Sequence, residues 1–390
     1  MEAWQQGGFG VYLHWPYCQS KCPYCDFNSH VTQAVDQSRW AAAYVAEIHR
    51  VGAETGNRVV NSIFVGGGTP SLMDPALVEA VIRQIHNTWT VANDIEITLE
   101  ANPGSVEAGR FNAYAAAGVN RVSLGVQALN DVDLRRLGRL HSAADAHKAI
   151  EIAQSSFSRV SIDLIYARQD QSVEAWEREL QTALSLGTSH LSLYQLTVED
   201  GTVFGRLHRR NMLRGLPGED AAADMFEATR AICMDAGLPA YEVSNHAREG
   251  EESRHNLIYW RAGDYVGIGP GAHGRLTLSG RRYATAAERM PDKWLSSVEL
   301  GKAGDVTCDE LSGPEQAAEY LMMSLRLTEG ASLERYSKIA GTPVNPTAFS
   351  GLIELGLLSL DGERLSTTSR GVLMLDGILR SLLVGRETAA

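Results

Sequence analysis

The sequence predicts an α/β fold: a partial, TIM-like (β/α)6 barrel with a small winged-helix-like domain after it. Six short apolar runs alternate with longer segments of helical periodicity, which is typical of parallel strands joined by helical crossovers. The alternation alone fits either an open doubly wound sheet or a barrel. The polar residues at the strand ends, described next, favour a barrel, and six units suit an incomplete barrel better than a closed eight-stranded one. After about residue 308 the pattern changes to three helical segments and a hairpin.

The expected barrel strands are near-continuously apolar. In chain order they are 11–15, 62–68, 95–103, 121–127, 159–167 and 190–198. Polar residues gather at or just beyond the ends of these strands, namely 66–69, Glu100, Gln127 and Asp163. Because the carboxyl ends of parallel strands meet on one face, we expect the chemistry of the protein to lie there.

The C-terminal segment divides into helices at 315–327, 332–341 and 349–358 and a hairpin at 357–368 that turns at Asp361-Gly362. We therefore expect a barrel domain over residues 1–300 and a C-terminal domain over 308–385, joined by the polar stretch 300–315. The C-terminal segment has more acids than bases, and its arginines are scattered. This favours structural use or protein docking over DNA binding.

Composition limits the partners. With 390 residues and 44% hydrophobic residues, the chain can bury a full core. Its net charge of -12 argues against binding nucleic acid or anionic lipid through the overall electrostatic field of the protein. The chain shows neither a signal-peptide pattern nor a run of about 18 apolar residues. We expect a cytoplasmic protein without an integral membrane segment, whose partners are small molecules or proteins.

Three cysteines, Cys18, Cys22 and Cys25, form a CxxxCxxC triplet in the run HWPYCQSKCPYCDFNS. In a reduced cytosolic protein, three such thiolates can hold three irons of a cubic cluster and leave the fourth iron open. The alternative is a structural zinc site, which needs four ligands. Because no second CxxC pair follows, His14 or His30 would have to supply the fourth ligand. The remaining cysteines, at 233 and 308, lie far away, which disfavours a disulfide scaffold.

The triplet, with the aromatic Tyr24 before its last cysteine, resembles the radical S-adenosylmethionine (SAM) superfamily, and FVGGGTPSLM resembles its motif for the amino group of SAM. TLEANPGS, SLGVQALNDVDLRRLGRLH, IDLIYARQDQS and LSLYQLTVEDGT resemble the anaerobic coproporphyrinogen III oxidase-like family. YEVSNHAREGEESRHNLIYW and YVGIGPGAHG resemble its HemW-type haem chaperone branch. The resemblance implies a radical SAM barrel with a [4Fe-4S] cluster and SAM.

The resemblance also implies roles for single residues. Cys18, Cys22 and Cys25 match the cluster ligands. The positions that match residues around SAM are Tyr12, Tyr24, Gly67, Gly68, Thr69, Glu100, Gln127, Arg139 and Asp163. The chemistry agrees, because a carboxylate can accept the two ribose hydroxyls and a guanidinium can pair with the SAM carboxylate. Taken without the family, Arg139 equally fits a solvated helix.

The run HNLIYW contains His255, Tyr259 and Trp260, which offer an imidazole for an axial iron bond and two aromatic faces for a flat macrocycle. By residue type alone, these side chains equally fit a packed core. The resemblance associates the segment with haem. It does not single out an axial ligand, and His14, His246 and His273 are further candidates.

Two functions follow. One is a haem chaperone that binds haem and a SAM-liganded cluster and delivers haem to client haemoproteins, such as respiratory ones. The other is oxygen-independent decarboxylation of coproporphyrinogen III by radical SAM chemistry. The decarboxylases resemble this chain less at two places. The decarboxylase pattern has a further cysteine at the position that Phe27 holds in this chain. The decarboxylases also have a long extension before the tyrosine that matches Tyr12, whereas only eleven residues precede Tyr12 here. Both departures favour the chaperone.

Overall fold

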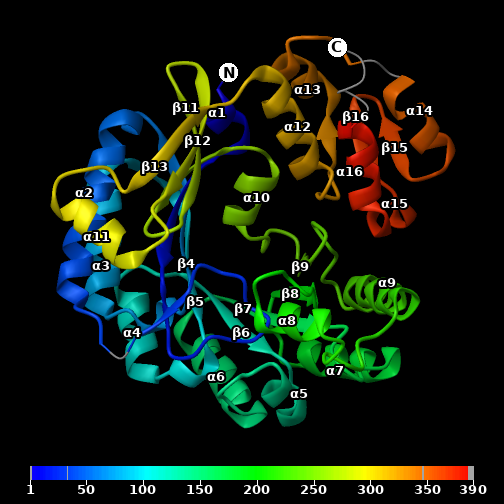
Figure 1. The fold of residues 1–390 in the computed structure, drawn as a ribbon, viewed down its shortest axis with the longest axis horizontal. Helices are drawn as coiled ribbons and strands as arrows, with labels where there is room; N and C mark the ends of the chain where they lie inside the picture. Colours follow the sequence, from blue (N-terminus) through cyan, green and yellow to red (C-terminus); the bar gives the residue numbers. More distant parts are fainter. Residues whose placement is uncertain (1, 33, 345–346, 385–390) are drawn as a thin grey trace.

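The computed structural model describes residues 2–32, 34–344 and 347–384. Its centre is an open, curved sheet with the strand order β13-β12-β11-β10-β1-β4-β5-β6-β7-β8-β9 (Figure 1). The strands from β10 to β8 in this order run parallel to their neighbours. Their bounds are β10 (Asp264–Ile268), β1 (Phe9–Trp15), β4 (Val59–Gly67), β5 (Thr90–Ala101), β6 (Arg121–Gln127), β7 (Arg159–Tyr166) and β8 (His190–Gln195).

Both edges of the sheet are antiparallel. At one edge β9 (Asn245–Ala247) pairs with β8. At the other, β11 (His273–Leu278), β12 (Arg281–Ala287) and β13 (Asp305–Glu310) extend the sheet beyond β10. The order does not close on itself, so the barrel is partial, as the sequence predicts.

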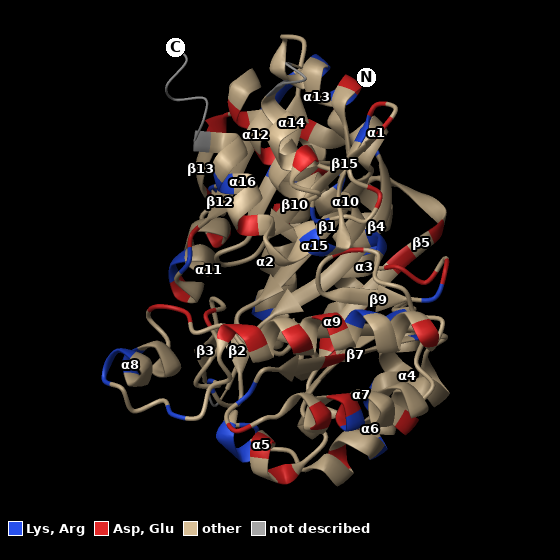
Figure 2. Cartoon of the chain, turned by 90° about the vertical axis from the view of Figure 1, so that its right-hand side faces the viewer, with Lys and Arg blue, Asp and Glu red and all other residues tan. Residues whose placement is uncertain are grey.

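Helices follow the parallel strands and lie on the outer side of the curved sheet (Figure 1). They are α2 (Gln37–Thr55), α3 (Pro75–Thr88), α4 (Ala108–Ala116), α6 (Ala143–Ser156), α7 (Val173–Ser185) and α9 (Glu219–Asp235). Side-chain caps fix where several of them begin: Asp36, Ser142 and Ser172 each accept a hydrogen bond from a backbone N–H of the first turn. Acidic and basic residues are interspersed along α7 and α9 (Figure 2), as expected for helix faces in water.

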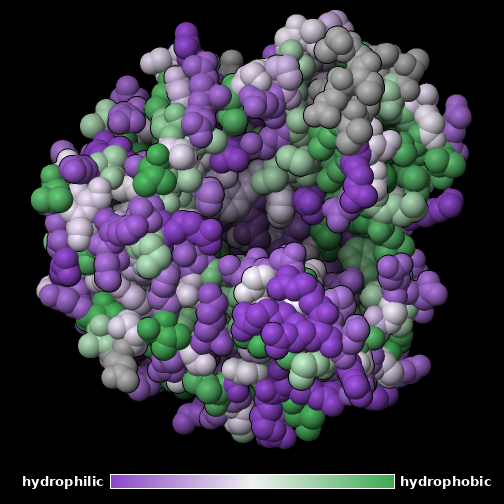
Figure 3. Space-filling model, viewed as in Figure 1, coloured by the Kyte–Doolittle hydropathy of each residue, from purple (hydrophilic) through white to green (hydrophobic). Residues whose placement is uncertain are grey.

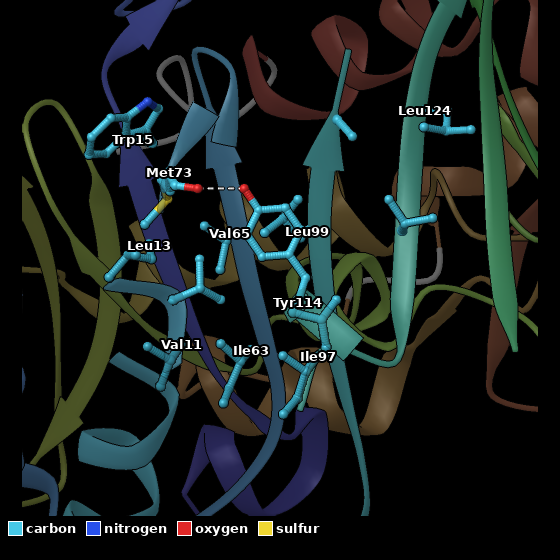
Figure 4. Close-up of a cluster of buried hydrophobic side chains, with 14 of the residues drawn as sticks. Val11, Leu13, Trp15, Ile63, Val65, Met73, Ile97, Leu99, Tyr114 and Leu124 are labelled. Atoms are coloured by element: carbon cyan, nitrogen blue, oxygen red, sulfur yellow. Dashed lines mark hydrogen bonds between the residues drawn. The ribbon is translucent and has the colours of Figure 1, made fainter. Parts of the chain in front are cut away.

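Alternate strand residues form the core beneath these helices. Val11, Leu13 and Trp15 of β1 are fully buried, and Ile63 and Val65 of β4 lie beside them (Figure 4). Burying each such side chain contributes about 1.5–3 kcal/mol. The opposite faces of the same strands point into the concave side of the sheet, where polar and aromatic side chains collect. Viewed from that side, the surface is hollowed near its centre, between the C-terminal domain and α8 (Figure 3).

The remaining elements of the main domain are shorter. They are α1 (Ala3–Gly7), β2 (Tyr17–Cys18), β3 (His30–Val31), α5 (Asp131–Arg136), α8 (Val203–Arg209), α10 (Arg254–Trp260), α11 (Pro291–Glu299) and the single turns 70–72 and 103–105. None of the helices in the described residues is both long and apolar enough to cross a membrane.

The C-terminal domain has its own buried cluster, which includes Tyr320, Leu321, Tyr336 and Leu365. Its elements are α12 (Gly313–Ser324), β14 (Ala331–Ser332), α13 (Leu333–Ala340), α14 (Thr347–Glu354), β15 (Leu358–Asp361), β16 (Arg364–Thr367), α15 (Ser369–Leu373) and α16 (Leu375–Val384). The helices and hairpin expected for a winged-helix-like domain are therefore present.

Three details differ from the sequence prediction. Strand β10 adds a parallel neighbour to β1 that the apolar runs did not indicate. The expected linker 300–315 contains β13, so residue 308 lies inside the main sheet; this strand is polar because it is an exposed edge. The hairpin turns at Gly362 and Glu363, one residue later than expected, because the glycine takes the positive φ of the first turn position.

Candidate functional site

The cysteine loop, residues 16–29, leaves the carboxyl end of β1 and is fastened on both sides. The Gly68 N–H donates to the carbonyl oxygen of Trp15 over 2.7 Å, which joins the base of the loop to the end of β4. At the far end of the loop, Asn28 Nδ2 donates to the carbonyl oxygen of Pro270 over 2.9 Å. The loop is thus held between β4 and the β10–β11 turn.

The cysteine thiols line a cavity of about 570 Å³, here called the cofactor cavity. Thr69 Oγ1 lies 3.4 Å from Cys18 Sγ, and Arg139 Nη1 lies 3.5 Å from Cys22 Sγ. Burial raises the pKa of the Cys18 and Cys25 thiols. Within the described residues, no three His, Cys, Asp or Glu side chains are gathered as ligands of a single metal ion. The donors to sulfur are of the kind that tune thiolate-bound clusters.

The end of β4 brings bare backbone to the cavity. Gly67 has a φ of +111°, and a Cβ there would lie 2.7 Å from the ring of His14. At Gly68 a Cβ would lie 2.7 Å from the carbonyl oxygen of Tyr17. Both positions therefore require glycine, because a side chain there would clash with the protein, and both residues line the cavity.

Two largely buried carboxyl groups, Glu100 and Asp163, line the cavity. Burial, with the neighbouring Asp163, raises the pKa of Glu100 to about 8. Burial also raises the pKa of Asp163, although Ser123 Oγ donates to it over 3.0 Å. The Gly67 N–H donates to Glu100 Oε2 over 3.1 Å. Such a pair favours a ligand that brings positive charge or hydroxyl donors.

Arg139 is positioned by the backbone of β6. Its Nη2 donates to the carbonyl oxygen of Gly125 over 2.7 Å, whereas its Nε is buried and has no partner among the described residues. Burial lowers the pKa of this guanidinium, but Tyr24 and Cys22 raise it more, so it stays charged. Gln127, at the end of β6, has a φ of +72°, which is uncommon for a residue other than glycine. An unsatisfied, charged guanidinium suits a carboxylate ligand.

A second cavity of about 370 Å³, the aromatic cavity, adjoins the first. The two cavities share Phe27, Gly67 and Glu100 as lining residues. The other residues that line the aromatic cavity are Tyr12, His14, Asn28, Tyr259, Tyr265, Gly271 and His273. Tyr259 and Tyr265 meet edge to face, with ring centroids 4.3 Å apart.

The HNLIYW segment forms helix α10, which enters the concave side of the sheet. His255 is 1% exposed, and its Nδ1 and Nε2 lie 2.9 Å from Ser62 Oγ and 2.8 Å from Tyr259 Oη. Both ring nitrogens are therefore engaged. Trp260 faces the C-terminal domain instead, where the guanidinium of Arg326 lies 5.7 Å from its ring centroid.

The structure brings most of the expected residues to one place. The cofactor cavity is lined by Cys18, Cys22, Cys25, Tyr24, Gly67, Gly68, Thr69, Glu100, Gln127, Arg139 and Asp163. Tyr12 lines the aromatic cavity instead, with its hydroxyl 2.9 Å from His14 Nδ1. Sequence reasoning missed Tyr194 and Gln195, which also line the cofactor cavity, although they end β8 and the strand-end rule applies to them.

Known proteins resemble this chain over nearly its whole length. The sequence profile of the Radical SAM superfamily matches residues 12–205, and that of the HemN C-terminal domain matches residues 311–374. Over 379 residues the chain is 36% identical to the heme chaperone HemW of Escherichia coli (strain K12), which covers 96% of this chain and 97% of that protein. The chain belongs to the HemW family of radical SAM proteins.

Other similarities extend this result. The chain is 39% identical over 385 residues to radical S-adenosyl methionine domain-containing protein 1, mitochondrial, of Mus musculus, covering 96% of this chain and 87% of that protein. Its structure superposes on coproporphyrinogen III oxidase (HemN) from Escherichia coli with a TM-score of 0.80 at 20% identity, covering 96% of this chain and 89% of the other. At that identity the likeness concerns the fold. The family predicted from the sequence is confirmed.

Proposed function

We propose that this protein holds a [4Fe-4S] cluster and SAM in the cofactor cavity and binds haem in the aromatic cavity, from which it delivers haem to client haemoproteins. The observation that carries the proposal is the second, tyrosine-lined cavity that shares a wall with the first. Relatives named heme chaperone HemW, similar over nearly their full length, support it.

The cofactor cavity suits a cluster and SAM. Three thiols on one loop can bind three irons, and a cluster held in this way supplies an open iron that SAM can chelate and an electron that SAM can accept. Around it, the charged guanidinium of Arg139, which lines the cavity, suits the SAM carboxylate, and Glu100 and Asp163 suit the ribose hydroxyls and the positive charge. Gly67, Gly68 and Thr69 line the same cavity and match the motif that meets the amino group of SAM.

The aromatic cavity suits part of a flat macrocycle. Tyr12, Tyr259 and Tyr265 supply aromatic surface, and the volume of about 370 Å³ lies within the usual range of ligand pockets. His255 holds the hydroxyl of Tyr259 in place. Phe27, 57% exposed, lies in the wall shared by the two cavities, where the decarboxylase pattern has a cysteine.

One experiment tests the function. The cluster is reconstituted anaerobically, and the same sample is assayed for stable haem binding, for haem transfer to an apo-haemoprotein such as a respiratory cytochrome, and for decarboxylation of coproporphyrinogen III. We expect binding and transfer. Decarboxylation at enzyme-like rates, or a failure to bind haem, would overturn the proposal.

A cysteine variant tests the cluster separately. Cys22→Ser is expected to abolish cluster assembly, whereas Cys308→Ser, at an exposed thiol on the edge strand β13, should keep about four irons and four sulfides per chain. Iron and sulfide analysis with the absorption spectrum gives the result. A full content of iron and sulfide in Cys22→Ser would contradict the assignment of the cysteine triplet as the cluster ligands.

A further inference from the structure

Haem held for transfer needs an axial iron ligand, and the histidines near the aromatic cavity differ in what their rings can offer. We propose that His273, at the start of β11, is the axial ligand of haem in the aromatic cavity, and that His255 is a positioning residue for Tyr259. This inference rests on the haem binding proposed above. It reverses the expectation from the HNLIYW segment, in which His255 is the first candidate.

Two candidate histidines have no free ring nitrogen. The two nitrogens of His255 lie against Ser62 Oγ and Tyr259 Oη. The ring of His14 is held in the same way, with Nδ1 2.9 Å from Tyr12 Oη and Nε2 2.9 Å from the carbonyl oxygen of Asn28. An iron bond to either would break a buried hydrogen bond and leave its partner unsatisfied.

A third candidate, His246, is in the wrong place. It lies on β9, is 1% exposed, and lines neither the aromatic cavity nor the cofactor cavity. Burial lowers its pKa to about 3. It therefore belongs to the packing between β8 and β9 rather than to the haem site.

His273 differs in both respects. It lines the aromatic cavity, its side chain is exposed, and its ring makes no hydrogen bond to any residue that the structure describes. Its backbone is fixed tightly, because a Cβ on Gly267 of β10 would lie 2.0 Å from the His273 carbonyl oxygen. The fold thus presents a free imidazole on a rigid support at the cavity, as an axial ligand requires.

The surroundings of His273 also suit haem. Two cationic side chains, Arg275 and Arg289, lie near enough to act on the His273 ring electrostatically. Arg275 is paired with Glu319 of α12 over 2.9 Å. The guanidinium of Arg289 forms no ion pair with the described residues and is exposed, so it can meet a haem propionate.

Phenolate ligands are less suitable. The hydroxyls of Tyr12 and Tyr259 are engaged by histidine rings. Burial raises the pKa of Tyr265, which keeps it a neutral phenol and a poor iron ligand. Among the described residues that line the aromatic cavity, His273 therefore offers the imidazole nitrogen that is free to bind iron.

The test compares ferric haem binding by the full, reconstituted chain and three alanine variants, using absorption and electron paramagnetic resonance spectra. His273→Ala should lose the nitrogen-ligand signature, and its dissociation constant should rise roughly tenfold or more. His255→Ala should keep the signature, as should His86→Ala, a control at an exposed position on α3.

Two further measurements separate ligation from a structural effect. Added imidazole should restore the spectrum of His273→Ala, and His273→Cys should give a thiolate-type spectrum. A wild-type spectrum in His273→Ala, or loss of the nitrogen signature in His255→Ala alone, would overturn the inference. If the wild-type chain binds no haem, the proposed function itself fails.

Discussion

Replacing Glu100 with glutamine should stabilise the cluster-free, ligand-free protein, and the gain should grow with pH. Folding raises the pKa of this carboxyl from its ordinary 4.5 to about 8 because the group is buried beside Asp163. A raised carboxyl pKa means that the folded protein binds the proton more tightly than the unfolded chain, so stability falls as the pH rises from 4.5 to about 8. Below that window the carboxyl carries no penalty.

The size of the effect follows from the two pKa values. Each pH unit inside the window costs the folded protein about 1.4 kcal/mol, so the penalty is about 2 kcal/mol at pH 6 and about 5 kcal/mol at pH 9. Glutamine cannot ionise, and its Oε1 can still accept from the Gly67 N–H. The advantage of Glu100→Gln over the wild type should therefore increase by about 3 kcal/mol between these pH values.

Urea unfolding of the anaerobic apoprotein, followed by tryptophan fluorescence at both pH values, measures this difference. Glu107→Gln is the matched control, because Glu107 is exposed. Its effect should not change with pH. An advantage of Glu100→Gln that is the same at pH 6 and pH 9 would refute the argument that the buried carboxyl resists ionisation.

Two further predictions concern the backbone and the buried charges. Gly67→Ala should lower the free energy of unfolding in urea by about 1–3 kcal/mol, because the positive φ and the close His14 ring strain the folded state. Gly104→Ala, with no atom within 3.4 Å of the added Cβ, should not, and equal losses in the two variants would contradict this. Asp264→Ala should lower the free energy of unfolding by about 3–5 kcal/mol, because it removes the shared ion-pair partner of two buried arginines. Glu299→Ala, which breaks an exposed ion pair, should lower it far less. If both variants lost a similar free energy of unfolding in urea, the burial of an ion pair would not determine the cost of breaking it.

The fold was largely predictable because the strands of the parallel sheet are buried on one face and carry strong apolar signals. Strand β10 was missed because it is five residues long and gains its place only by pairing with β1, which lies far away in the sequence. Strand β13 was missed for the opposite reason. Its side chains are mostly exposed and polar, so its pairing with β12 rests on backbone hydrogen bonds, which leave no pattern in the sequence.

The cofactor cavity was predictable from strand ends and motifs, whereas the partners of single side chains were not. The motif that contains His255 indicates an imidazole that could bind iron. Nδ1 of that imidazole is instead hydrogen-bonded to the hydroxyl of Ser62, which lies 193 residues earlier in the chain. Trp260 faces the C-terminal domain for a similar reason, since its neighbour Arg326 lies just after α12, 66 residues later in the chain. Residue type indicates what a side chain can bind, and tertiary packing decides whether it is free to do so.

The wall shared by the two cavities has a thermodynamic consequence. Because Phe27, Gly67 and Glu100 face both spaces, a ligand that moves or charges any of them alters the neighbouring space as well. If SAM binding changes the affinity for haem by some factor, haem binding must change the affinity for SAM by the same factor. Two titrations, each in the presence and absence of the other ligand, would measure this factor twice. In the proposed chaperone, occupancy of the cofactor cavity would thus set how tightly haem is held, to the extent that this factor differs from one.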